Sequence, residues 1–331
     1  MKIDRKLLPF FIILAVLALL PLYFRTNSYV MHILIMCLIW GIVAANWDLI
    51  VGYGGVFSFG QIAFFAIGAY TSAVLAKTGL RSLDIGLSPW LSMFIGGGAA
   101  GLSGFLIGLP CLRLKGIYIA LVTFTLHETL SPILRLGGDI GTGGAGGCVS
   151  IPPFYLGGYI FTPLERVPTF YLALAIFAVV IYLVYRLIHS PIGLAFVSLR
   201  DSEPLARSLG ISEYKYKLIL FTISAFLTGI AGAFYAHYTG LISRTVLGLD
   251  VFVLVIVMVI VGGLGRFPGA IIAAFIFTIL NEFLRPLEAF RPIILGILAI
   301  VIIIWAPEGL TGIRGYFVRF RQRIKSLGVK G

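Results

Sequence analysis

Four carboxylates lie in or beside long apolar stretches of the chain. Asp48, Glu128 and Glu282 fall within such stretches, and Asp250 falls at the edge of one. An ionised side chain at the centre of a membrane helix is unfavourable by about 2.5–3.5 kcal/mol, so such residues usually have a partner or a function. These carboxylates therefore either line a path for a polar solute or hold helices together through hydrogen bonds. The sequence leaves both interpretations open.

The stretches around these carboxylates are long enough to be membrane spans. Hydrophobic residues make up 60% of the 331 residues and charged residues 11%, whereas soluble domains contain about 45–50% and 25%. We predict an all-α polytopic membrane protein with about ten spans, in a range of about eight to ten. The predicted spans lie near 7–24, 30–50, 61–77, 89–109, 116–134, 169–188, 217–237, 250–264, 268–284 and 292–306. The first is expected to be retained, because no small-residue cleavage site follows it. The last three are short enough for one of them to be re-entrant.

The basic residues predict which side of the membrane each segment faces. The net charge is +12, but Lys and Arg cluster between the apolar runs, which argues against a nucleic-acid-binding protein. With the N-terminus in the cytoplasm, about 17 Lys and Arg fall in cytoplasmic segments and about 8 in outer ones, as the positive-inside rule requires. Both termini are therefore predicted to be cytoplasmic.

Two glycine-interrupted segments, 51–58 and 261–268, stand about 210 residues apart, one in each half of the chain. Aligned without gaps, the segments and the residues that follow them share Val, Gly, Gly, Phe, Ala and Phe. Transporters use paired broken helices to turn backbone groups towards a pathway. Glycine and alanine also simply allow helices to approach closely. Either interpretation accounts for the repeat.

The predicted cytoplasmic segment 186–217 carries signals for a short amphipathic helix. Ser190 and Pro191 end one span, and the run 201–204, Asp-Ser-Glu-Pro, is typical of a helix start. The following turns would place Leu205, Ala206 and Leu209 on one small apolar face, with Arg200, Glu203 and Arg207 as charges around it. An ordinary basic loop is the alternative.

An ordered set of motifs covers nearly the whole chain. The segment 46–71 reads Asn, then Gly-Tyr-Gly-Gly, Ser-Phe-Gly-Gln and Ala-Phe-Phe-Ala-Ile-Gly-Ala-Tyr-Thr; later matches lie at 116–118, Thr123, Glu128, 142–144, 190–193, 209–211, 262–265, 281–285 and 307–310. In this order the motifs resemble the LivM-type permeases of branched-chain amino-acid ABC importers. The chain departs from that pattern at Pro204 and Leu205. It also departs at Gly146, which stands where the family has Asn in an outer glycine-rich run that is either a flexible loop or a contact for a substrate-delivering protein.

The resemblance implies candidate residues for two sites. Polar residues of the motifs become candidates for the translocation pathway: Asn46, Ser58, Gln61, Thr123, Glu128 and Glu282. The segment 186–217 becomes the loop that couples to an ATPase, with Gly193, Arg200, Glu203, Ala206, Leu209 and Gly210 as its candidate residues. No metal site is expected, since Ser131 stands where a His127-Glu128 zinc helix would need its second histidine.

The resemblance also implies the location of the chain and its partner subunits. Residues 1–331 would form one permease domain of the bacterial inner membrane, with a basic cytoplasmic tail at about 307–331. The chain has no Gly-Lys pair and hence no phosphate-binding loop. ATP and Mg would therefore be bound by ATP-binding cassette subunits, and this chain would hold no cofactor. A second permease of the LivH type and a periplasmic substrate-binding protein are the other expected partners.

Other functions remain open at this stage. A stand-alone secondary transporter could use membrane carboxylates to relay protons. An intramembrane protease is weaker, because Ser103 and His237 lie about 9 Å and about 30 Å from the inner ends of their predicted spans. The cargo could be a branched-chain amino acid, another amino acid, an amide or urea. Whether the second permease is a related chain or another copy is also open.

Overall fold

The computed structural model describes residues 16–21, 23, 27–78, 87–114, 116–161, 166–305 and 309–310, which are mostly helical. Among them, five helical segments are long and apolar enough to cross a membrane: α2 Ser28–Asp48 with its π-helical extension η1 Leu49–Tyr53, α4 Pro89–Cys111, α5 Ile117–Leu136, α6 Arg166–Ile188 and α9 Glu213–Thr239. Shorter apolar helices are α3 Gln61–Thr78, α10 Leu249–Gly262, α11 Gly269–Phe283 and α12 Arg291–Trp305. The predicted all-α membrane fold is confirmed.

The helices follow the apolar runs of the sequence closely. Every predicted span from 30–50 onward corresponds to one helix, and the bounds differ by at most four residues. The predicted span 7–24 and the basic tail 307–331 lie largely outside the described residues. Helices α10, α11 and α12 have 14, 15 and 15 residues, or about 21–23 Å, which is shorter than the roughly 30 Å of hydrocarbon.

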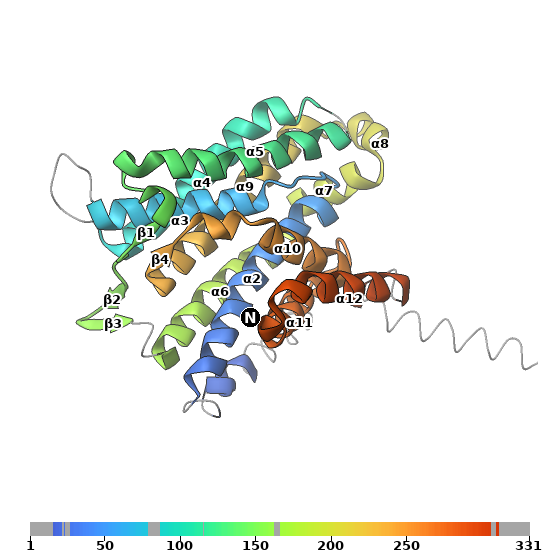
Figure 1. Ribbon diagram of the computed structural model, residues 1–331. Helices are drawn as coiled ribbons and strands as arrows, with labels where there is room; N and C mark the ends of the chain where they lie inside the picture. The colour runs from blue at the N-terminus through green and yellow to red at the C-terminus, as the bar shows by residue number, and fades with distance from the viewer. Residues whose placement is uncertain are drawn as a thin grey trace, which may run out of the picture.

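Figure 1 shows how the helices are arranged. Helices α3, α4, α5 and α9 lie together, while α2 crosses the molecule with α6 and α11 packed along it. Two short helices, α7 Pro191–Asp201 and α8 Glu203–Ser208, lie at one end, and the strands lie at the opposite end. Because α2 contacts α6, α9, α10 and α11, it joins the early and late parts of the chain.

Helix α9 forms the tightest packing, between α3 and α4. A Cβ atom on Gly229 of α9 would lie only 2.4 Å from the Cβ of Ala100 on α4. Small residues at helix contacts let backbones approach closely, which replaces the hydrophobic driving force that lipid cannot supply. Helix α9 therefore packs as part of one body with α3 and α4.

The end opposite α7 and α8 is closed by short strands and turns. Strand β1 Cys148–Val149 pairs antiparallel with β4 Leu241–Ile242, and β2 Phe154–Leu156 pairs with β3 Tyr159–Phe161. The glycine-rich run forms the 3₁₀ turns η2 Gly137–Ile140 and η3 Gly144–Gly146; η4 Arg244–Leu247 and η5 Arg285–Phe290 complete this end. The Thr142 hydroxyl donates to the carbonyls of Leu134 and Gly137 at 3.0 and 2.7 Å. The glycine-rich run is thus an ordered cap on α5.

Candidate functional site

The two glycine-interrupted segments contact each other. The amide of Gly265, in the loop between α10 and α11, donates to Oδ1 of Asp48 at 2.7 Å. The amide of Phe267 in the same loop donates to the hydroxyl of Tyr53 at 3.0 Å. We call this contact between residues 48–55 and 263–268 the glycine junction. Each broken segment satisfies polar groups of the other, so Asp48 acts as a hydrogen-bonded structural carboxylate.

Only glycine fits at the centre of the glycine junction. A Cβ atom on Gly52 would lie 2.1 Å from both the Gly265 nitrogen and the Asp48 Oδ1. Gly265 has a φ of 68°, which is the left-handed region that residues with a side chain rarely adopt. Of the two interpretations of the glycine repeat, the described contacts favour close packing.

Helix α7 reaches the glycine junction through Arg200, its penultimate residue. The Arg200 Nη1 donates to the carbonyl of Gly52 at 2.7 Å, and its Nε donates to Asp201 Oδ1 at 2.9 Å. At the start of the helix, the Ser190 hydroxyl accepts from the Gly193 amide at 3.2 Å, a serine N-cap. Gly193 and Arg200, both predicted in the coupling segment, therefore lie in the first and last turns of α7, a helix that the sequence did not reveal as a separate element.

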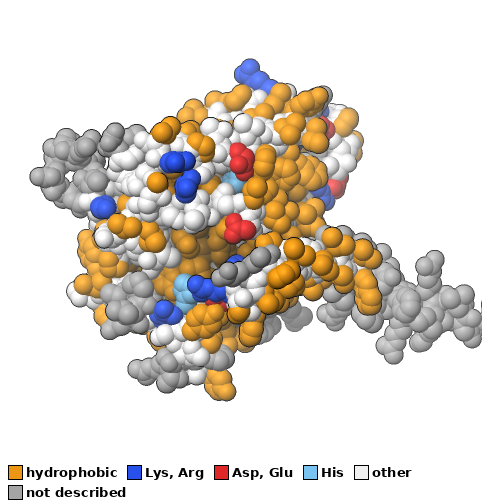
Figure 2. Space-filling view, viewed as in Figure 1, with side chains coloured by type: hydrophobic (Ala, Val, Ile, Leu, Met, Phe, Trp, Pro, Cys, Tyr) orange, Lys and Arg blue, Asp and Glu red, His pale blue; other side chains and the backbone are white. Residues whose placement is uncertain are grey.

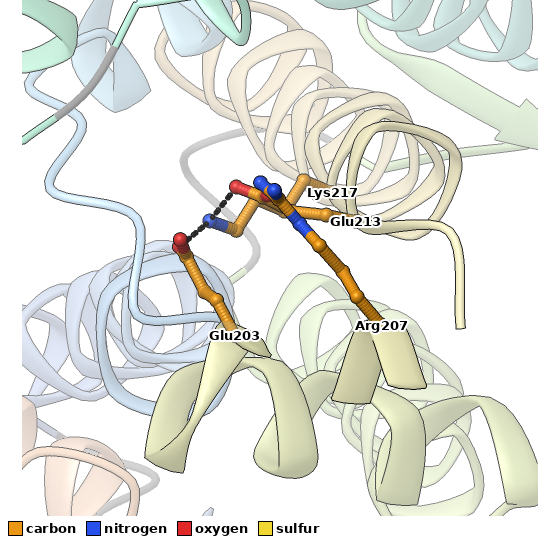
Figure 3. A network of polar contacts seen from close by, with 4 residues as sticks. All are labelled: Glu203, Arg207, Glu213 and Lys217. Atoms are coloured by element: carbon orange, nitrogen blue, oxygen red, sulfur yellow. Dashed lines mark hydrogen bonds and ion pairs between the residues drawn. The ribbon is translucent and has the colours of Figure 1, made fainter. Parts of the chain in front are cut away.

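Helix α8 is tied to the first turn of α9 by four charged side chains (Figure 3). The Lys217 Nζ donates to Glu203 Oε1 at 2.5 Å and to Glu213 Oε1 at 2.8 Å. Arg207 of α8 also pairs with Glu213. Isolated surface ion pairs contribute little, but networks of several charges contribute more. The predicted short helix starts at Glu203, as its sequence indicates, and is held against α9.

Leu205, Ala206 and Leu209 were predicted to share one apolar face of α8, and this prediction is wrong for Ala206. Ala206 is 1% exposed, whereas Leu205 and Leu209 are 62% and 72% exposed. Residues four apart share a helix face, but neighbours are turned about 100° from each other. Ala206 therefore packs inwards, while Leu205 and Leu209 point away from the chain. Gly210 follows with a φ of 79° and ends the helix.

Four of the six predicted pathway residues gather where α2 breaks and α3 begins. They are Asn46, Ser58, Gln61 and Thr123, all buried. Together with Ser224 and Thr228 of α9 we call them the polar core. The Gln61 amide donates to the hydroxyls of Ser224, at 3.0 Å, and Thr228. Ser224 in turn donates to the backbone carbonyl of Asn46 at 2.7 Å.

The extended stretch before α3 is held by the other polar contacts. The Trp47 indole donates to the Ser58 carbonyl at 2.7 Å, and the Phe59 amide donates to the Thr123 hydroxyl at 2.8 Å. The side-chain oxygens of Asn46 and Gln61 are buried and have no partner among the described residues. Buried carbonyl oxygens of this kind are acceptors that a donor on a passing solute can use.

The two predicted glutamates do not join the polar core. Glu128 lies on α5 with its side chain 49% exposed, and its Oε1 is 3.9 Å from the Nε2 of buried His127. Glu282 lies in the last turn of α11, accepts from the Tyr29 hydroxyl at 2.7 Å and pairs with Arg285 at 2.9 Å. The charge of Glu282 is thus satisfied within the chain at a helix end.

Sequence reasoning missed Ser224 and Thr228. Their spacing of four residues places both on one face of an otherwise apolar span. That spacing could have identified them, because a polar stripe within a membrane helix usually faces protein.

The residues of the protease hypothesis have other partners. The Ser103 hydroxyl donates to the Ala100 carbonyl of its own helix at 2.8 Å. His237 contacts Ser72 at 2.8 Å and the Pro152 carbonyl at 2.7 Å. Ser103 and His237 therefore do not form a pair, as their predicted depths required.

Comparison with known proteins identifies a family model and several relatives that match the chain. The family model described as "Branched-chain amino acid transport system / permease component" matches residues 29–306. The chain is 32% identical to the high-affinity branched-chain amino acid transport system permease protein LivM of Escherichia coli, over 87% of this chain and 71% of that protein. It is 32% identical to LivM of Salmonella typhimurium, over 89% and 72%, and 24% identical to the ribose import permease protein RbsC of Haemophilus influenzae, over 86% of each. No solved structure matches the chain significantly. The resemblance inferred from the motifs is confirmed.

The glycine junction makes a prediction about Gly52. We expect Gly52→Ala to force the two segments apart, because its Cβ would overlap the Gly265 nitrogen. Overpacking of a buried contact costs about 1–3 kcal/mol. The yield and thermal stability of the detergent-purified protein measure the effect. Gly98→Ala is the matched control, since a Cβ on that helical glycine of α4 would meet no atom within 4 Å. Equal stability of the two variants would contradict the close contact.

Proposed function

Because the chain belongs to the family of branched-chain amino acid permease components and is a membrane permease subunit of an ABC importer, we propose that it carries branched-chain amino acids into the cell while partner subunits hydrolyse ATP. The observation that carries the choice of cargo is the identity to two LivM permeases over most of the chain. RbsC, named for ribose, is more distant. Family membership also favours an ABC permease over the secondary-carrier and protease alternatives.

Permeases of such importers work with ATP-binding and substrate-binding subunits. In the proposed assembly, α8 docks into a groove of the ATP-binding subunit through Leu205 and Leu209, which are exposed and one turn apart. ATP and Mg are bound by that subunit, and no cofactor is bound by this chain. Two unpaired leucines on a short helix at one end of the molecule support this placement.

Two connections lead from this docking surface to the middle of the protein. The first runs through Arg200 to the Gly52 carbonyl in the glycine junction. The second runs through Glu203 and Lys217 into α9, whose Ser224 holds the backbone of Asn46. A displacement of α7 and α8 by the ATPase would therefore move both the glycine junction and the polar core. We assign to the polar core the role of lining the pathway.

A second permease would cover α5. This helix is the least buried of the five long ones, and Glu128 lies 11 residues, or about 16 Å, along it from Ile117. Figure 2 shows acidic side chains over α5 and α10, bordered on one side by hydrophobic side chains. A half-exposed carboxylate in mid-span is unfavourable in lipid. We propose that a related LivH-type chain shields it.

The proposed orientation places α7 and α8 in the cytoplasm and the strands outside, in the bacterial inner membrane. It follows the Lys and Arg asymmetry of the sequence. Because the spans from α2 to α12 alternate in direction, the C-terminal tail would be cytoplasmic. The predicted span 7–24, which precedes α2, would place the N-terminus in the cytoplasm as well.

Uptake by the reconstituted complex tests the cargo. We expect proteoliposomes with the two permeases, ATPase and binding protein to accumulate labelled leucine, isoleucine and valine only when ATP is supplied on the ATPase side. An excess of unlabelled isoleucine should compete, whereas ribose and urea should not. Uptake by the permeases without the ATPase, or competition by ribose alone, would contradict the proposal.

Docking through α8 is tested by its exposed leucines. We expect Leu205→Glu or Leu209→Glu to lower recovery of the ATPase with the permease by about tenfold or more, since an unpaired charge would enter an apolar groove. Leu114→Glu is the control, because Leu114 is an exposed leucine in the α4–α5 connection at the same end. Co-purification measures recovery. Full recovery with both α8 variants would contradict the docking surface.

Cysteine labelling tests the orientation. The three native cysteines are buried and free, so they give little background. We expect Leu156→Cys, at an exposed position of β2, to react with a membrane-impermeant maleimide added to intact cells. Ser208→Cys, at the end of α8, should react only after the cells are opened. Labelling of Ser208→Cys in intact cells would reverse the topology.

A further inference from the structure

A pocket of about 250 Å³ lies among α2, α10, α11 and α12. Its polar lining comes from Asp250, Asn281 and Arg291, and its apolar lining includes Trp40, Leu254 and Leu295. Pockets for drug-sized molecules measure roughly 300–1,000 Å³, so this pocket suits a smaller molecule. From the sequence, Asp250 stands out only as a carboxylate at the edge of a span.

The two charged side chains of this pocket, Asp250 and Arg291, do not form an ion pair with each other. Among the described residues, no donor forms a hydrogen bond or ion pair with the Asp250 carboxylate. Arg291 donates through Nε to the Asn281 carbonyl oxygen at 2.5 Å. That bond orients the guanidinium, which has five N–H donors, and leaves its terminal nitrogens for a ligand. A free acceptor and free donors thus line one small pocket.

A neighbouring pocket provides a contrast. It has a volume of about 590 Å³ and is lined by Tyr29, Glu282 and Arg285, among others. There the carboxylate already accepts from the Tyr29 hydroxyl and from Arg285. A ligand ammonium would have to displace both. The larger pocket is therefore the poorer site for a charged ligand.

We propose that the pocket at Asp250 and Arg291 binds a free α-amino acid with a small aliphatic side chain, and that it is the outer binding site on the permease. The carboxylate of Asp250 takes the ammonium group, and the Arg291 guanidinium takes the carboxylate, which Arg matches in geometry. Trp40, Leu254 and Leu295 enclose the aliphatic part. This inference rests on the proposed function for the direction of transport. A sugar carries neither charge, so its hydroxyl groups could form only neutral hydrogen bonds to these residues and would leave both of their charges uncompensated.

The position of the pocket fits an entry site. Asp250 and Arg291 lie in the first turns of α10 and α12. Trp40 lies 12 residues, or about 18 Å, along α2 from Ser28, so the pocket reaches from the outer end into the membrane. Six residues further along α2, or about 9 Å, Asn46 begins the polar core. A solute that leaves the pocket inwards would meet the polar core next.

Equilibrium binding tests the pocket separately from transport. The permease–ATPase complex in nanodiscs, without the binding protein, is titrated with labelled leucine. Competitors are 4-methylpentanoate, which lacks the ammonium, and 3-methylbutylamine, which lacks the carboxylate. We expect Asp250→Asn and Arg291→Gln each to weaken leucine binding by about 10- to 100-fold, as loss of one charged hydrogen bond implies. Asp250→Asn should leave the affinity for 4-methylpentanoate unchanged, and Arg291→Gln should leave that for 3-methylbutylamine unchanged.

Two further variants control for folding. Asp250→Glu keeps the charge and should restore leucine binding to within about threefold of the native value. Lys77→Gln removes a charge at the same end of the molecule, on α3, where the ammonium donates to the Val149 carbonyl, and should bind leucine normally.

The outcomes separate this inference from the proposed function. If the native complex transports leucine but both charge-removing variants bind it normally, the pocket assignment is wrong and the function stands. If phosphatidylethanolamine, also a zwitterion, co-purifies with the native protein and is lost from both variants while leucine affinity is unchanged, the pocket holds lipid and the assignment is overturned. If the native complex takes up no branched-chain amino acid but binds leucine, and both charge-removing variants weaken that binding, the proposed function fails and the pocket assignment stands.

Discussion

The contact between the two broken segments is the constraint on which the rest of the structure depends. A chain that interrupts its helices within a membrane must find partners for the freed backbone groups, because lipid offers none. Here Asp48 accepts from Gly265, and Gly52 offers its carbonyl to Arg200. Hydrogen bonds to charged groups contribute about 1.5–3 kcal/mol each. These hydrogen bonds join the early and late halves of the chain beside the helices at the α7–α8 end.

In the proposed mechanism, this contact is one of the connections between the α7–α8 end and the pathway. Arg200 belongs to α7 and ends in the glycine junction, while Lys217 ties α8 to α9, whose Ser224 and Thr228 hold Gln61. Helix α9 is packed too closely against α3 and α4 to move alone. In the proposed mechanism, closure of the ATPase therefore acts on the pathway through rigid bodies and two small sets of polar contacts.

The sequence predicted the helices well and the side-chain partners less well. Apolar runs between charged, Gly and Pro residues indicate where membrane helices begin and end, so the predicted spans from 30–50 onward match the helices to within four residues. The motif residues Asn46, Ser58, Gln61 and Thr123 did converge, because they flank one helix break. Ala206 was misplaced because a six-residue helix leaves its rotation about its axis undetermined. Glu282 was expected inside the membrane, but its pairing with Tyr29 comes from a helix about 250 residues away in sequence, which no local pattern reveals.

In the proposed mechanism, Arg200 transmits the movement of α7 to the glycine junction. The most direct measurement is the number of ATP molecules hydrolysed per leucine transported by the reconstituted complex that carries Arg200→Gln. We expect hydrolysis to continue while the amount of leucine transported per ATP falls by about tenfold or more, as loss of a charged hydrogen bond implies. An unchanged ratio, with the complex intact, would contradict it.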